Sequence, residues 1–89
     1  MTHLNIKIYG RVQGVFFRHS ARKEAEKIGI TGFARNDPDG SVYIETEGEK
    51  ENLEKFLAWC RQGPPLAKVE KVDFEFDKTL QNFTDFTYH

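Results

Sequence analysis

What the 89-residue sequence lacks already narrows its function. It has one cysteine, so no disulfide can form within the chain and nothing in it requires an oxidising compartment. No run of apolar residues approaches the roughly 20 needed to cross a bilayer, and no secretory leader is recognisable at its start. We therefore expect a single domain over residues 1–89, located in the cytoplasm and without a membrane partner.

The charge balance argues against a nucleic-acid-binding protein. The net charge is −1, which excludes an overall basic field. Residues 1–36 carry seven Lys/Arg and two Glu, whereas residues 37–89 carry six Lys/Arg and twelve Asp/Glu. Tyr9 and Tyr43 would offer bases a stacking surface, but the basic glycine-aromatic strand of RNA-recognition domains is missing. We expect no nucleic-acid partner and a small anionic ligand near the positive half of the chain.

Metal and nucleotide motifs are also missing. The three histidines show no metal-ligand spacing, the acidic residues of segment 45–54 match no EF-hand loop, and the Walker pattern is absent. We expect no metal and no cofactor. His3 and His89 are expected at the surface, as are the acidic residues of segment 45–54. His19 adjoins Arg18 and could border a site there, although an exposed helix position is the simpler interpretation.

The order of apolar patterns indicates the fold class. Alternation predicts strands at about 4–9, 31–36, 41–47 and 72–77 and a short one at 86–88, and helical spacing predicts helices at about 17–28 and 49–61. Asp37-Pro38-Asp39-Gly40 predicts a hairpin turn between the second and third strands. Val69 is out of phase with the fourth strand, which indicates a bulge or a bend. The order β-α-β-β-α-β plus a short C-terminal strand predicts an α+β, ferredoxin-like sandwich, an antiparallel sheet with two helices on one face.

The segment from Gly10 to Arg18 joins the first strand to the first helix. Gly10 and Gly14 allow turned backbone that can point successive N–H groups inward as an anion-binding nest. The helix that follows adds unpaired N–H groups and the positive end of its dipole. Arg18 adds a planar guanidinium that fits two phosphate oxygens at once. The residues alone leave open a plainer interpretation, a glycine-kinked loop that ends in a solvated arginine.

Asn36 ends the second strand, just before the hairpin turn. In a split βαβ arrangement the first two strands run in the same direction, so Asn36 should face the Gly10–Arg18 loop across one edge of the sheet. Its amide could hold a water molecule in line with a leaving group. The alternative is that Asn36 only initiates the turn, and the spacing does not decide between the two.

Cys60 is a weaker candidate for chemistry. It lies on the apolar stripe of the second helix, with no histidine or aspartate in phase beside it. Reactive thiolates need an electropositive, partly exposed site. We therefore predict that Cys60 is a buried structural residue.

The chain resembles the acylphosphatase family over nearly its whole length. The segment Ile8–Arg18 matches the family's first signature throughout. A second signature matches around the hairpin, at Gly32 to Asn36, Gly40 to Val42 and Gly48. A weaker third signature follows the second helix, at Gly63, Pro64, Ala67, Val69 and Val72. Phe33-Ala34 stands where many members carry Trp-Val, which is a difference in packing and not at a reactive position.

The resemblance implies hydrolysis of small acyl phosphates to a carboxylate and inorganic phosphate, without a metal or cofactor. It implies that Arg18 is the catalytic arginine that binds phosphate and that Asn36 orients the attacking water. The position six residues before Arg18, where cysteine phosphatases carry their nucleophile, is Val12. Direct attack by water follows, and we expect a monomer. The implied phosphate-binding residues are Gln13, Gly14, Val15, Phe16, Phe17 and Arg18.

A non-catalytic anion-binding or interaction module on the same fold is the alternative function, because one fold hosts many functions. Such a module needs only the phosphate-binding loop. The presence of both Arg18 and Asn36 favours the enzyme.

Overall fold

The sheet is built around two interior strands, β1 and β3. The computed structural model describes residues 1–89, and its elements follow the predicted order. These are β1 (Thr2–Arg11), α1 (Phe17–Ile28), β2 (Thr31–Asn36), β3 (Val42–Gly48), α2 (Lys50–Gln62), β4 (Lys68–Asp77) and β5 (Phe86–Tyr88). Their spatial order in the sheet is β4-β1-β3-β2-β5.

Strand direction decides which loops meet. β1 pairs antiparallel with β3 and β4, and β3 pairs antiparallel with β2. β1 and β2 therefore run in the same direction, as predicted, and their C-terminal ends lie on the same side of the sheet. β5 adds to β2 in parallel, so the four antiparallel strands and β5 together form a mixed sheet.

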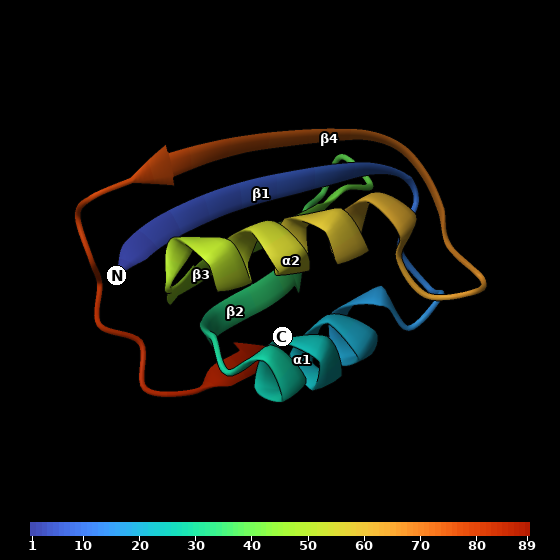
Figure 1. Ribbon diagram of the computed structural model, residues 1–89. Helices are drawn as coiled ribbons and strands as arrows, with labels where there is room; N and C mark the ends of the chain where they lie inside the picture. Colours follow the sequence, from blue (N-terminus) through green and yellow to red (C-terminus); the bar gives the residue numbers. More distant parts are fainter.

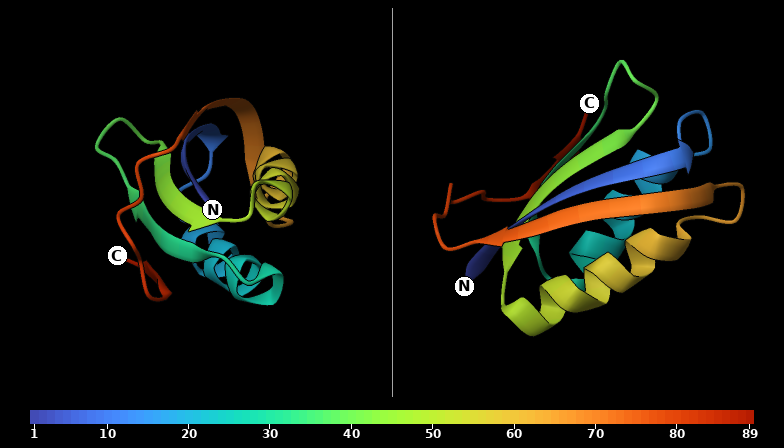
Figure 2. Two further views of the ribbon diagram at one scale, coloured as in Figure 1. Left: turned by 60° about the vertical axis from the view of Figure 1, so that its left-hand side comes forward. Right: turned by 90° about the horizontal axis from the view of Figure 1, so that it is seen from above.

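Both helices cover one face of the sheet (Figure 1), and the views in Figure 2 show the two layers. The strand residues that alternate toward the helices are buried, because a half-covered sheet hides every second side chain. On α2 the predicted stripe is buried, and Cys60 lies fully inside the core. The main contributors to this core are Leu4, Ile6, Ile8, Phe17, Ala21, Ala25, Val42, Ile44, Leu53, Phe56, Leu57 and Cys60.

The fourth strand departs from regular pairing where its sequence pattern changes phase. The register between β1 and β4 shifts between Tyr9 and Gly10, opposite the segment that holds Val69. This confirms the predicted irregularity. Phe74 is 45% exposed although it lies in phase with Val72. β4 is an edge strand, so its side chains have a neighbouring strand on one side only. The guanidinium carbon of Arg61 from α2 lies 5.5 Å from the centre of the Phe74 ring.

The segment between β4 and β5 passes around the end of the sheet to reach its other edge (Figure 1). The buried carboxylate of Glu47 holds this segment, because it accepts the backbone N–H groups of Gln81 at 2.6 Å and Asn82 at 2.9 Å. The ring of Phe83 lies 6.1 Å from the ring of His3. The segment thus covers the start of β1.

The expected surface position of His3 is wrong, since the residue is only 3% exposed. Its Nδ1 lies 2.7 Å from Glu47 and its Nε2 lies 2.8 Å from the side-chain oxygen of Asn5. Burial lowers the pKa of His3, but hydrogen bonds to Glu47 and Asn5 and the charge of Glu45 outweigh it, so the pKa is raised. Glu47, expected to be solvated, is 2% exposed.

Candidate active site

The loop between β1 and α1 has the backbone of an anion-binding nest. Gly14 has φ +74° and Phe16 has φ +65°, whereas Val15 between them does not take a positive φ. Left-handed residues on either side of a residue without a positive φ can turn successive N–H groups toward the same side of the chain. Phe16 is also the residue that caps α1, without any side-chain capping hydrogen bond. A left-handed phenylalanine is uncommon, and such strain concentrates at functional sites.

The N–H groups of this loop are not used by the protein. None of the backbone N–H groups from Gly14 to His19 donates to a protein acceptor, and the first such bond of α1 runs from Ser20 to the Phe16 carbonyl. The first turn of α1 contains no acidic residue that would compete for these donors. The dipole of α1 adds positive potential at the same point. The loop therefore offers several donors and a positive field to an anion.

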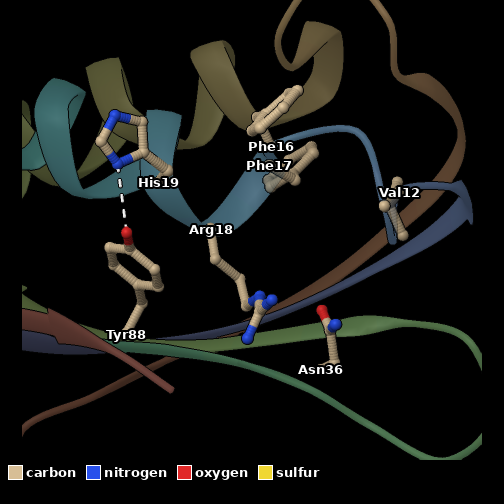
Figure 3. Close-up of a pocket in the computed structure, with 8 residues that line it drawn as sticks. Val12, Phe16, Phe17, Arg18, His19, Asn36 and Tyr88 are labelled. Atoms are coloured by element: carbon tan, nitrogen blue, oxygen red, sulfur yellow. Dashed lines mark hydrogen bonds between the residues drawn. The ribbon is translucent and has the colours of Figure 1, made fainter.

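Arg18 and Asn36 lie on either side of one pocket, as predicted from the direction of β1 and β2 (Figure 3). Arg18 comes from the first turn of α1 and Asn36 from the last position of β2. Nη1 of the Arg18 guanidinium donates to the main-chain oxygen of His89, just beyond β5. The pocket has a volume of about 500 Å³ and is lined by Val12, Gly14, Phe16, Phe17, Arg18, His19, Asn36 and Tyr88.

Two of the predicted phosphate-binding residues do not line this pocket with their side chains. Val15 is 5% exposed and belongs to the core. The amide of Gln13 instead donates to the carbonyls of Asp37 at 2.8 Å and Ser41 at 2.9 Å. Gln13 thereby ties the loop to the β2–β3 hairpin next to Asn36.

The hairpin turn is also fixed from within. Asp39 accepts hydrogen bonds from the Ser41 hydroxyl at 2.5 Å and from the Ser41 N–H at 3.0 Å. These bonds, with the ammonium of Lys7 at 3.2 Å, lower the pKa of Asp39 to about 2. The end of β2, and with it Asn36, is therefore held by both the turn and Gln13.

His19 and Tyr88 line the pocket. For His19 the sequence left open a place beside the site and favoured an exposed helix position, and the residue is both exposed and part of the pocket wall, whereas Tyr88 was not predicted as a site residue. Nδ1 of His19 lies 3.2 Å from the Tyr88 hydroxyl, and their rings meet edge-on at 5.9 Å. The only sequence signal for His19 is its place next to Arg18. For Tyr88 it is alternation from the buried Phe86, which puts both side chains on the side of the sheet that faces α1.

The remaining candidates lie outside the pocket. Cys60 is fully buried, and burial raises the pKa of its thiol. No group of three or more His, Cys, Asp or Glu side chains has the geometry of a metal site. Neither helix is long and apolar enough to cross a membrane.

Comparisons with known proteins agree on one family. A family model described as Acylphosphatase matches residues 4–88. The chain is 44% identical to the acylphosphatase of Methylococcus capsulatus over 86 residues, 97% of this chain and 94% of that one. It is 52% identical to the acylphosphatase of Thiobacillus denitrificans over 73 residues, 82% of each. The crystal structure of the acylphosphatase from Bacillus subtilis matches with a TM-score of 0.97 at 32% identity, covering 100% of this chain and 99% of that one.

Proposed function

The chain belongs to the acylphosphatase family and hydrolyses acyl phosphates to a carboxylate and inorganic phosphate, and we propose that it does so in the pocket beneath the β1–α1 loop. The observation that carries this proposal is the meeting of three parts in one pocket. They are an unused row of backbone donors, the guanidinium of Arg18 and the amide of Asn36.

The backbone N–H groups from Gly14 to Arg18 hold the phosphoryl oxygens, and the guanidinium of Arg18 neutralises their charge. Little covalent chemistry is required of the protein in phosphoryl transfer, so positioning and charge stabilisation supply most of the catalysis. The donors are fixed in place before substrate arrives, which lowers the reorganisation needed in the transition state.

Asn36 orients the attacking water. Its amide both donates and accepts, so it can fix a water molecule in line with the leaving group. A phosphate oxygen of the substrate accepts the proton that the water loses, and the carboxylate leaves without needing one. This mechanism assigns no role to a metal ion or to a protein base.

The test separates Arg18 from Asn36. Asn36→Ala should lower kcat for benzoyl phosphate by about 10²–10³ while phosphate affinity changes little. Arg18→Ala should weaken phosphate binding by about 10- to 100-fold, the worth of hydrogen bonds to a charged group, and also lower kcat. Arg18→Lys should recover only part of both, because an ammonium lacks the planar fork.

Calorimetric titration with inorganic phosphate measures the phosphate affinity, and hydrolysis assays in the presence of EDTA measure kcat. Asn52→Ala and Arg61→Ala, which change the same residue types on α2, serve as controls and should leave both unchanged. Circular dichroism must show that every variant is folded. Equal loss of phosphate binding in Asn36→Ala and Arg18→Ala would overturn the division of roles. Phosphate binding without turnover in the unmodified protein would favour the non-catalytic module.

We also propose that residues 1–89 act as a single-domain monomer in the cytoplasm, without nucleic-acid or membrane partners. One continuous core, a net charge near zero and a single buried cysteine support this. Light scattering after size exclusion measures the mass in solution, and a dimer mass would contradict it.

A further inference from the structure

The mechanism above leaves two polar residues of the pocket without a role. His19 comes from the first turn of α1 and Tyr88 from β5, elements that lie side by side in Figure 1. They meet through the contact between Nδ1 and the tyrosine hydroxyl, 3.2 Å apart. Two residues from distant parts of the chain thus form one hydrogen-bonded pair in the wall of the pocket.

This pair always keeps a donor for a third group. If the Tyr88 hydroxyl donates to Nδ1 of His19, the proton of the neutral ring is on Nε2. If Nδ1 donates instead, the tyrosine hydroxyl proton is free. In either tautomer one N–H or O–H is left without a partner within the pair. In Figure 3 the second ring nitrogen of His19 points away from Arg18, so the donor that can face a ligand beside Arg18 is the Tyr88 hydroxyl, with Nδ1 of His19 donating to it.

The pair lies on the side of the pocket where a leaving group would be. In Figure 3 the side chain of Arg18 stands between Asn36 and the pair. The guanidinium carbon of Arg18 is 5.9 Å from the centre of the Tyr88 ring, so a phosphoryl group held by Arg18 lies close to the tyrosine. In phosphoryl transfer the attacking and leaving oxygens are roughly in line, on opposite sides of phosphorus. A water held at Asn36 therefore drives the carboxylate toward the pair.

We propose that His19 and Tyr88 donate a hydrogen bond to the carboxylate as it leaves. The proposal rests on the proposed function of Arg18 and Asn36. In the step, the bond from the water oxygen to phosphorus forms and the bond from phosphorus to the acyl oxygen breaks. The electron pair stays on the carboxylate, the water's proton goes to a phosphate oxygen, and the free donor of the pair stabilises the new negative charge.

This assignment predicts which substrates depend on the pair. A more basic carboxylate carries more concentrated negative charge as it leaves, so it gains more from the hydrogen bond. The contribution should be largest for acyl phosphates of weak carboxylic acids. The pair would then extend the enzyme's range to poorer leaving groups.

The experiment uses benzoyl phosphates with nitro, hydrogen or methoxy at the para position, which vary the leaving group while nearly preserving its shape. We would measure kcat/KM against the pKa of the released acid for the unmodified protein, Tyr88→Phe, His19→Leu and the double variant. The double variant should lose about tenfold for the methoxy substrate and clearly less for the nitro substrate, which makes the plot steeper. His19→Leu keeps the tyrosine hydroxyl and should lie between, whereas Tyr88→Phe removes it and should resemble the double variant.

Tyr43→Phe is the matched control. It removes a hydroxyl that donates to Glu45 at 2.8 Å, and Tyr43 does not line this pocket. Its plot should parallel that of the unmodified protein. Phosphate affinity, measured by calorimetry, should be the same in all variants that change the pair, because the phosphoryl cradle is intact.

Parallel plots for the unmodified protein and the folded pair variants would overturn the inference, since a merely structural role lowers kcat/KM equally for all three substrates. If the double variant does not fold, the slopes of the two single variants decide the question. Failure of the proposed function has a different signature. The unmodified protein would then bind phosphate and hydrolyse none of the three substrates.

Discussion

Gly14→Ala tests whether the backbone of the loop binds phosphate. Gly14 has φ +74°, and a Cβ added to it would meet no atom within 4 Å. The substitution thus adds backbone strain of about 1–2 kcal/mol and no steric clash. No backbone N–H in the Gly14–Phe16 segment donates within the protein, so little prevents the loop from rearranging to relieve that strain.

After such a rearrangement the N–H groups of the loop would no longer point toward the same side of the chain. We therefore expect phosphate affinity to fall by about 5- to 30-fold, the equilibrium equivalent of the strain, with little change in the free energy of unfolding. Calorimetry with inorganic phosphate gives the affinity, and urea unfolding followed by circular dichroism gives the stability.

Gly29→Ala is the matched control at the other end of α1. Gly29 has φ +91° and also has no atom near its virtual Cβ. Here the backbone is held, because the N–H groups of Gly29 and Ile30 both donate to the Ala25 carbonyl, at 2.8 and 3.0 Å. The strain should therefore appear as lost stability with unchanged phosphate affinity. Phosphate binding of Gly14→Ala at the affinity of the unmodified protein would refute the role of the nest.

Two further predictions concern residues away from the pocket. Cys60→Ser should keep kcat for benzoyl phosphate within about twofold but lower the free energy of unfolding by about 1–3 kcal/mol, because a hydroxyl replaces a fully buried thiol. Lost turnover in the folded variant would contradict the structural assignment of Cys60. The pKa of His3 is raised in the folded protein, so its stabilising contribution is complete below about pH 6.5 and is lost as pH rises through that pKa. Urea unfolding from pH 6 to 9 should show this decline, and His3→Gln should remove it; equal slopes in both proteins would disprove the assignment.

Much of the fold could be predicted because its signals are local. Alternation and helical spacing identified every strand and helix, and the phase change at Val69 marked the irregular pairing of β4. The meeting of Arg18 and Asn36 could also be predicted, since it depends only on β1 and β2 running in the same direction.

The errors and omissions depend on contacts between distant segments. His3 looked like an exposed terminal residue, but the side chain of Glu47 and the returning chain near Phe83 lie against it. Tyr88 reaches the pocket because β5 pairs with β2 in parallel, a choice that three residues of sequence cannot specify. Phe74 is exposed because β4 lies at the edge of the sheet, which alternation alone does not reveal.

The start of β1 carries stabilising contacts, whereas its end leads into the strained loop, and this separation explains how the strain is tolerated. At its start, His3 and Glu47 form a buried cluster that also holds the segment before β5. Hydrogen bonds to charged groups of this kind are worth about 1.5–3 kcal/mol each. At its end, the loop keeps a left-handed phenylalanine at Phe16 and a row of donors that bond to nothing in the protein, which costs stability. Because the stabilising contacts lie at the opposite end of β1 from the loop, they can hold the fold together without occupying the donors that substrate needs.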